Sequence, residues 1–323
     1  MSDAGQSVGL AILDDYANAA LAAADWSPLM GRVERLTVFD RPFASEDEAA
    51  TALEGFDVVV AMRERTPFPA RLLHRLPRLR LLVTTGMRNN SFDLPAARAQ
   101  GVVVCGTRGV GSPTSELAIG LLIALVRDIP GQERSLREGR WQTRPGIGLA
   151  GKTLGIAGLG TVGGAVARAA LAMGMDVIAW SPNLTAERAA AHGVRRVEKA
   201  ELFGTADVVT LHLVLSDRTR EIVGAADLAL MRPGAFLVNT ARAGLVDQDA
   251  LFAALAGRRI AGAAMDVYER EPLPAGHRLL GLDNVLLTPH LGYATADNFT
   301  RMYRDAIEDI VAWLDGSPIR ELG

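Results

Sequence analysis

The sequence predicts an α/β protein that contains two doubly wound parallel sheets. Short apolar runs alternate with helical patterns along the chain, and such alternation is typical of parallel sheets joined by helical crossovers. The glycine pattern Gly158-x-Gly160-x-x-Gly163 ends one apolar run and precedes an Ala-rich helical pattern. A stretch rich in Gly, Ser, Thr and Pro at 106–113 separates the two series, and we expect a hinge there.

The first series of elements precedes this hinge. Its short apolar runs predict strands at 8–13, 35–39, 56–61, 79–84 and 102–105. Helical patterns lie between them, at 18–24, 45–53, 69–76 and 94–100. The helix at 45–53 carries the clearest start signal, because Ser45 can act as its N-cap and acidic residues occupy its first turn.

The second series begins with a long apolar helix at 115–127, for which Ser112, Thr114 and Ser115 are candidate N-caps. A polar helix ends before Gly139, and a strand begins at Thr153. Further strands are expected at 177–180, 208–213, 235–239, 260–265 and 285–287, with helices at 185–191 and 248–255. The last expected element is an amphipathic helix at 296–314, and we expect it to return to the first domain.

Composition excludes several classes of protein. The 323 residues suffice for two domains, and 49% of them are hydrophobic. A formal net charge of −3 gives no sign of a nucleic-acid partner. The single cysteine, Cys105, fits a reducing compartment, and the start of the chain, with Asp3, lacks a signal-peptide pattern. The apolar run at 117–126 is shorter than the roughly 20 residues that span a bilayer. We expect a cytoplasmic protein with no membrane partner and no metal site.

The glycine pattern has the strand–turn–helix context of a dinucleotide fingerprint. Gly158 would permit the tight turn, Gly160 would let a pyrophosphate approach, and Gly163 would let the helix pack closely on the strand. The N–H groups at the start of the helix would bind the phosphates. A glycine-rich turn used only for packing is the alternative.

Reactive side chains follow many of the expected strands, where ligands bind in parallel sheets. They are Arg63, Arg65, Arg88, Ser181, His212, Arg242, Asp266, Glu271 and His290. Each alone also suits a surface or structural role, because charged residues are mostly exposed. Arg242, Asp266 and His290, however, each end a strand of one sheet, with Glu271 close behind Asp266.

This set fits hydride transfer to a 2-oxoacid. The guanidinium of Arg242 can bind a carboxylate through two hydrogen bonds and polarise the carbonyl. Histidine, with an intrinsic pKa near ~6.5, exchanges a proton at neutral pH, so His290 is the candidate acid. Glu271 would orient that imidazole and favour its protonated form. Asp266 would contact the nicotinamide amide or ribose.

The motifs of this chain resemble those of a known family. The segments 158–163, 239–247, 266–272 and 288–292 occur in the order found in the D-isomer-specific 2-hydroxyacid dehydrogenases, and the resemblance covers essentially the whole chain. It implies a Rossmann-type NAD(P)-binding domain at 107–291, inserted into a flavodoxin-like substrate domain at 1–106 plus 292–323. It also implies a homodimer built on the nucleotide domains, with the helix that starts at Ser115 taking part.

The resemblance also implies roles for individual residues. Arg242, Glu271 and His290 would be catalytic. The implied cofactor contacts are Gly158, Gly160, Thr161, Val162, Gly163, Ser181, His212, Leu213, Val214, Thr219, Thr240, Ala241, Arg242, Asp266, His290 and Gly292. The implied substrate contacts are Arg63, Arg65, Met87, Arg88, Arg242 and His290.

Three positions depart from the family pattern. Ser181 stands where NAD-preferring members usually carry Asp, and no arginine follows immediately, so the choice between NAD and NADP stays open with NAD favoured. Arg88 replaces the second glycine of the substrate loop, and it either binds a second acidic group on the substrate or points to solvent. Ala243 replaces the glycine that usually follows the catalytic arginine.

The function implied is NAD(P)-dependent reduction of glyoxylate, hydroxypyruvate or a related 2-ketoacid, with oxidation of the D-2-hydroxyacid as the reverse reaction. The alternative from another class is a dinucleotide-sensing binding protein on the same scaffold, similar to the corepressor relatives of this family. The sequence favours the enzyme, because all three reactive groups are present and no recruitment tail is visible.

Overall fold

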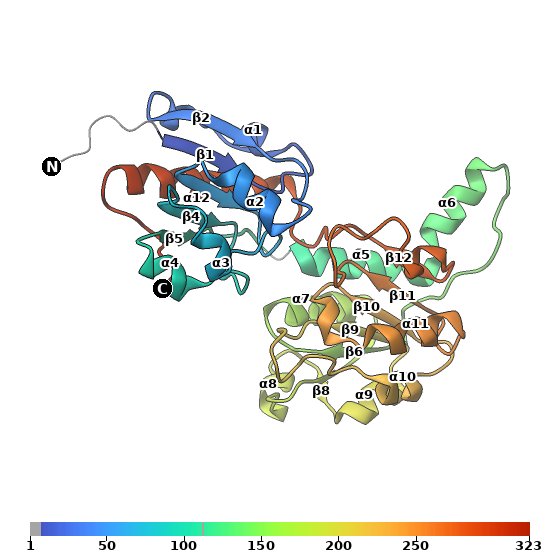
Figure 1. Cartoon of the computed structure of the whole chain (residues 1–323). Helices are drawn as coiled ribbons and strands as arrows, with labels where there is room; N and C mark the ends of the chain where they lie inside the picture. Colours follow the sequence, from blue (N-terminus) through green and yellow to red (C-terminus); the bar gives the residue numbers. More distant parts are fainter. Residues whose placement is uncertain (1–7, 112) are drawn as a thin grey trace. The chain divides into compact units, whose positions relative to one another are not determined.

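The computed structural model describes residues 8–111 and 113–323, and these divide into two compact units (Figure 1). Unit 1 comprises Met1–Gly111 together with Thr295–Gly323, and unit 2 comprises Ser112–Ala294. Two residues named in the sequence analysis, Asp3 and Ser112, lie outside the described residues.

Unit 1 contains a five-stranded parallel sheet in the order β2-β1-β3-β4-β5. Its strands are β1 (Val8–Ile12), β2 (Val33–Val38), β3 (Val58–Ala61), β4 (Leu81–Thr84) and β5 (Val103–Gly106). Its helices are α1 (Ala20–Ala23), α2 (Glu46–Leu53), α3 (Ala70–Leu73), α4 (Leu94–Ala99) and α12 (Ala296–Leu314). Helices α2, α3 and α4 share one apolar core with the sheet, whereas α12 packs on β4 and α1.

Unit 2 contains a seven-stranded parallel sheet in the order β12-β11-β10-β9-β6-β7-β8. Its strands are β6 (Thr153–Ala157), β7 (Asp176–Trp180), β8 (Arg195–Arg196), β9 (Val208–Leu211), β10 (Phe236–Asn239), β11 (Gly262–Met265) and β12 (Val285–Leu287). Its helices are α5 (Pro113–Arg127), α6 (Ile129–Arg137), α7 (Thr161–Ala172), α8 (Ala186–Ala190), α9 (Lys199–Thr205), α10 (Ala225–Leu230) and α11 (Gln248–Ala256).

The predicted fold class, two doubly wound parallel α/β sheets, is therefore confirmed. In unit 2, α5, α7 and α8 cover one face of the sheet, and α9, α10 and α11 cover the other. Because both faces are covered, the central strands are buried and mostly apolar, which is why the sequence shows continuous runs rather than alternation. The strand order reverses between β6 and β9, which creates the crevice where doubly wound sheets bind ligands.

Some element boundaries differ from the sequence prediction. The helix expected at 18–24 is limited to Ala20–Ala23, because the Asp15 carboxylate accepts the N–H groups of Ala19 and Ala20 and Asn18 has a positive φ of 51°. The strand expected at 208–213 ends at Leu211. The sequence analysis did not identify β8, an exposed edge strand of two arginines without an apolar pattern.

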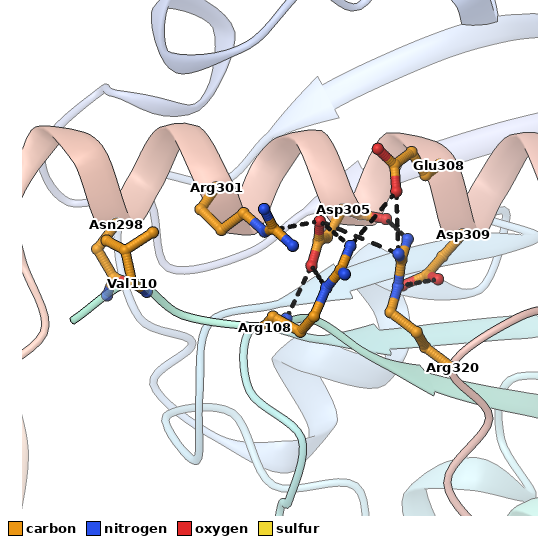
Figure 2. A network of polar contacts seen from close by, with 8 residues as sticks. All are labelled: Arg108, Val110, Asn298, Arg301, Asp305, Glu308, Asp309 and Arg320. Atoms are coloured by element: carbon orange, nitrogen blue, oxygen red, sulfur yellow. Dashed lines mark hydrogen bonds and ion pairs between the residues drawn. The ribbon is translucent and has the colours of Figure 1, made fainter. Parts of the chain in front are cut away.

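In unit 1, α12 is tied to the segment after β5 by one buried carboxylate and one buried amide side chain (Figure 2). Asp305, fully buried, accepts hydrogen bonds from the main-chain N–H of Arg108 and from its guanidinium, at 2.9 to 3.1 Å. Asn298 accepts the N–H of Val110 at 3.1 Å. This segment leads into unit 2, so α12 fixes where the chain leaves unit 1.

Asp309, one turn after Asp305, is also fully buried and accepts a hydrogen bond from Arg320 Nε at 2.9 Å. Its second oxygen has no hydrogen-bond partner among the described residues. Burial raises the pKa of Asp309 to about 7, against the opposing effect of Arg320. The neighbouring guanidinium of Arg108 instead helps to hold the pKa of Asp305 below its ordinary value, in spite of burial.

Asp309→Asn is expected to change the pH dependence of stability. Between the ordinary pKa of 3.8 and about 7, folded Asp309 retains a proton that the unfolded chain releases. Its contribution to the free energy of unfolding therefore falls as pH rises through this window, by at most about 1.4 kcal/mol per pH unit. The free energy of unfolding of the wild type minus that of Asp309→Asn should therefore decline as pH rises through this window. Urea unfolding, followed by Trp26 and Trp313 fluorescence with Trp141 and Trp180 replaced by Phe, measures this.

Asp305→Asn is the matched control on the same helix. Because the pKa of Asp305 is lowered, its stabilising contribution is present above the ordinary carboxyl pKa and is lost only as pH falls below about 4. If the difference in unfolding free energy between the wild type and Asp309→Asn does not change between pH 4 and 7, the prediction is contradicted.

Candidate active site

The glycine turn between β6 and α7 has the shape needed for a dinucleotide. Gly158 has a φ of +104°, and a Cβ there would lie 2.6 Å from the His212 carbonyl carbon. A Cβ on Gly163 would lie 2.1 Å from the Gly158 carbonyl oxygen, so only glycine permits this close approach of α7 to the turn. A Cβ on Gly160 would meet nothing within 4 Å, so the space above this glycine is open.

The start of α7 therefore suits a pyrophosphate. The helix begins at Thr161, directly after Gly160, and its first N–H groups have no preceding carbonyls within the helix. The open space at Gly160 lies at this positive end of the helix dipole. These residues fit the phosphates of a nicotinamide dinucleotide, with Thr161 and Val162 in the first turn as predicted contacts.

The other predicted cofactor residues follow the carboxyl ends of β7, β9 and β10. Ser181 comes directly after β7 and is half-buried, and the 181–186 segment contains no acidic side chain. Thr240 follows β10, and its buried Oγ1 has no hydrogen-bond partner among the described residues, so a ligand donor or acceptor would satisfy it. Ala241 continues this turn, and its N–H donates to the Asn239 side chain.

Residues 212–219 form the loop after β9. His212 Nε2 lies 3.0 Å from Thr210 Oγ1, and burial lowers the pKa of His212 to about 4, which favours the neutral imidazole. Thr219 Oγ1 donates to the Val214 carbonyl at 2.6 Å and accepts the Ser216 N–H at 2.8 Å. Thr219 thus shapes the loop, whereas Val214 is exposed on it.

Three neighbouring strands bring the reactive residues to one edge of the sheet. Arg242, Asp266 and His290 follow β10, β11 and β12, which are adjacent and parallel. Arg242 is half-buried, and its Nη1 donates to the Ala241 carbonyl at 2.8 Å. The Asn239 side chain donates to the Arg242 carbonyl at 3.0 Å and so fixes the turn that carries the guanidinium.

His290 and Glu271 form a close pair. His290 Nδ1 lies 2.5 Å from Glu271 Oε2, and the two side chains are 21% and 24% exposed. The Tyr293 ring packs edge-on against the imidazole, with 5.6 Å between ring centroids. Because Nδ1 is occupied by Glu271, the second ring nitrogen, Nε2, is the one available for proton exchange.

Asp266 holds the segment that carries His290. Its fully buried carboxylate accepts three hydrogen bonds, from Thr288 Oγ1 at 2.6 Å and from the N–H groups of Leu291 and Gly292 at 2.7 and 2.8 Å. Burial raises the pKa of Asp266, while these donors and His290 oppose that shift. Both oxygens are thus engaged within the chain, and the contact of Asp266 with the nicotinamide amide or ribose stays a prediction.

The predicted substrate arginines belong to unit 1. Arg63 and Arg65 follow β3, and Met87 and Arg88 follow β4, all at the carboxyl edge of that sheet. The main-chain N–H of Arg63 donates a hydrogen bond to Thr85 Oγ1 at 2.9 Å. The structure thus distributes the predicted site residues over both units.

A cluster around Arg65 and two residues of unit 2 were not given roles by the sequence analysis. The Arg65 guanidinium lies over the Tyr16 ring, 4.4 Å from its centroid, and Tyr16 and Thr66 donate to the Asp14 carboxylate at 2.9 and 2.7 Å. In unit 2, Tyr268 and Thr288 contact the His290 segment. Both lie inside recognised motif segments, but a motif does not indicate which side chain contacts which.

The fold and the glycine turn are those of a dinucleotide-binding protein, and the same sheet edge carries a His–Glu contact and an arginine. Residues 119–292 match the family model described as "D-isomer specific 2-hydroxyacid dehydrogenase, NAD binding domain". The chain belongs to the D-isomer specific 2-hydroxyacid dehydrogenase family. The predicted family is confirmed, and the predicted nicotinamide dinucleotide cofactor agrees with the matched domain.

Named relatives give the same family. A D-3-phosphoglycerate dehydrogenase of Archaeoglobus fulgidus is 36% identical over 279 residues, which are 85% of this chain and 53% of the relative. A hydroxypyruvate reductase of Thermotoga maritima is 35% identical over 82% of this chain and 87% of its own length. The crystal structure of a phosphoglycerate oxidoreductase from Vibrio cholerae superposes with a TM-score of 0.90, at 36% identity, over 96% of this chain and 100% of that one.

The chain spans about half the length of the first three curated relatives, 53%, 56% and 50%. Among residues 8–111 and 113–323, no helix has both the length and the apolar character to cross a membrane. The same residues contain no group of three or more His, Cys, Asp or Glu side chains placed to hold a metal ion.

Gly160→Ala and Gly163→Ala are expected to separate binding from folding. The Gly160 methyl would enter open space, so that variant should fold like the wild type but bind NADH or NADPH at least about 10-fold more weakly, since the methyl occupies the space proposed for the pyrophosphate. The Gly163 methyl would collide with the Gly158 carbonyl and should lower the melting temperature of unit 2. Cofactor fluorescence titration and thermal unfolding measure the two effects. Wild-type affinity in Gly160→Ala would contradict the assignment.

Proposed function

We propose that the chain is an oxidoreductase that acts on the CH–OH group of a D-2-hydroxyacid with NAD or NADP and reduces the corresponding small 2-oxoacid in the reverse direction. The observation that carries the proposal is the 2.5 Å contact between His290 Nδ1 and Glu271 Oε2, on the sheet edge that also bears Arg242 and the glycine turn. The relatives named as reductases and dehydrogenases support it.

A nicotinamide dinucleotide, when bound, supplies or accepts the hydride. Gly160, Thr161 and Val162 would hold its phosphates at the start of α7. Arg242 would bind the substrate carboxylate through its planar guanidinium and polarise the neighbouring carbonyl. His290 would donate the proton from Nε2 to the developing alkoxide during reduction, and would accept it during oxidation. Glu271 would stabilise the imidazolium from the Nδ1 side.

Unit 1 would supply the remaining substrate contacts. Arg63, Arg65, Met87 and Arg88 lie at the carboxyl edge of its sheet, the edge at which parallel α/β sheets bind ligands. Residues 1–106 plus 292–323 would form the substrate domain and 107–291 the nucleotide domain. Glyoxylate, hydroxypyruvate and related 2-ketoacids are the proposed substrate class, and the names of relatives support it.

The cofactor is NAD or NADP, with NAD favoured. An acidic side chain after β7 would bind the ribose hydroxyls and repel a 2′-phosphate, and Ser181 does neither strongly. No arginine directly follows Ser181 to bind the phosphate of NADP. Ser181 therefore gives no strong discrimination.

We also propose a homodimer built on unit 2 and a location in the cytoplasm. Helix α6 and the loop after it project from the rest of unit 2 (Figure 1), and they expose Ile129, Leu136, Trp141 and Ile147. Such a set of exposed apolar side chains is typical of a protein interface. The sedimentation mass of the full chain decides the oligomeric state. The single cysteine, Cys105, is buried and suits a reducing compartment.

The proposed function is tested by His290→Ala and Arg242→Ala. With NADH and NADPH, the wild type should lose absorbance of the reduced nicotinamide on addition of a panel of 2-oxoacids. Each variant should lose at least about 100-fold in kcat/KM, because proton transfer and carboxylate binding are removed. Cofactor affinity, measured by fluorescence titration, should stay within a few-fold of wild type. His192→Ala, at a histidine of unit 2 beside α7, is the matched control for loss of an imidazole.

Two outcomes would count against the proposal. Wild-type turnover in either variant would remove that residue from catalysis. Cofactor binding without turnover of any 2-oxoacid, together with a stable protein partner, would instead favour the dinucleotide-sensing alternative, which the names of the relatives do not favour.

Glu271→Gln is expected to move the basic limb of the pH–rate profile for 2-oxoacid reduction to lower pH. The amide can still accept a hydrogen bond from Nδ1, but it lacks the negative charge that stabilises the imidazolium. The measurement is kcat/KM as a function of pH, with Glu269→Gln, an exposed neighbour, as control. An unchanged limb would show that Glu271 does not act on His290.

A further inference from the structure

We propose that Tyr268 is a positioning residue that acts on both members of the acid/base pair, His290 and Glu271. It lies directly after β11, three residues before Glu271, and is half-buried. The kinetic consequence of this proposal rests on the proposed function, whereas its consequence for the His290 imidazole does not.

The main chain of Tyr268 fixes Glu271. Its N–H donates to Glu271 Oε1 at 3.0 Å, while Oε2 of the same carboxylate lies 2.5 Å from His290 Nδ1. One carboxylate thus bridges the Tyr268 amide and the imidazole. The hydrogen bond from the Tyr268 N–H to Oε1 restrains the rotation of the Glu271 carboxylate. In that orientation the other oxygen, Oε2, faces His290 Nδ1.

The side chain of Tyr268 reaches the other end of the pair. Its hydroxyl lies 3.0 Å from the Met265 carbonyl oxygen and 2.9 Å from the Thr288 carbonyl oxygen, and shares its one proton between them. The Thr288 carbonyl also accepts the N–H of His290 at 3.0 Å. Tyr268, Glu271, His290 and Thr288 therefore form a closed ring of hydrogen bonds.

This ring acts on a backbone that needs support. His290 has a φ of 53°, in the left-handed region that is unfavourable for residues other than glycine. The contact between its N–H and the Thr288 carbonyl is part of what maintains that conformation, together with the Asp266 carboxylate beyond it. A hydroxyl that restrains the Thr288 carbonyl therefore restrains the direction in which the imidazole points.

The hydroxyl can serve as a donor throughout the range of an activity assay. The charged groups that face it are Asp266, from the end of β11, and Glu271, from the loop after it, with His290 as the titrating neighbour of both. Burial and the two carboxylates raise the pKa of Tyr268 well above its ordinary value of 10. The phenol stays protonated, so a pH effect of its removal reports on His290.

Tyr268→Phe tests the proposal, because it removes the hydroxyl and keeps the ring. The titration of His290 is followed in the cofactor-free protein by long-range nitrogen–proton correlation spectra, with His290→Gln to assign the signal. Loss of the restraint should weaken the Glu271 contact and move the titration midpoint of His290 to lower pH by a few tenths of a unit or more. In the active protein, kcat for 2-oxoacid reduction should fall about 5-fold, with the basic limb of its pH profile shifted to lower pH.

Tyr303→Phe in unit 1 is the matched control for the loss of a buried tyrosine, and it should leave the His290 titration unchanged. An unchanged midpoint in Tyr268→Phe overturns the proposal, as does a loss of kcat that accompanies a lower melting temperature without any shift in the pH profile. A shifted midpoint in Tyr268→Phe, combined with a wild type that reduces no 2-oxoacid, would support the positioning role and refute the proposed function separately.

Discussion

The contact between His290 and Glu271 is the interaction on which the site depends. A carboxylate beside an imidazole selects one tautomer, leaves one nitrogen for chemistry and favours the charged form. The two residues are only 19 positions apart, yet they follow different strands, β11 and β12. The parallel register of these strands brings their carboxyl ends together, and Asp266 and Tyr268 at the end of β11 hold the turn that presents the imidazole.

Much of this architecture could be predicted from the sequence. Buried parallel strands give continuous apolar runs, which the sequence shows. The glycine pattern predicts a tight turn, and the structure shows why glycine is needed there, since a Cβ on Gly163 would collide with the Gly158 carbonyl. Chemistry and motif context also singled out Arg242, Glu271 and His290, whose catalytic roles stay predictions. What the sequence missed were short elements, namely β8 with its two exposed arginines and the helices α9 and α10.

Side-chain partners could not be predicted, because a contact depends on conformation as well as on position along the chain. The sequence did not indicate that the Asp266 oxygens accept hydrogen bonds from Thr288, Leu291 and Gly292, and its contact with the cofactor stays a prediction. The left-handed φ of His290 gives no signal in the sequence, since glycine is the residue that usually marks such a conformation. The ring through Tyr268 is likewise visible only once β11 and β12 are paired.

The buried carboxylates of the two units differ in their hydrogen-bond partners and therefore in their pKa values. Asp305 is compensated by Arg108 and holds the segment that leaves unit 1, while Asp309 keeps one oxygen without a partner and favours its proton. Burial likewise raises the pKa of Asp266, while its three hydrogen-bond donors, two of them backbone N–H groups, oppose that shift. Asp266 thus acts on the imidazole through the backbone of the segment that carries it, whereas Glu271 contacts the ring directly.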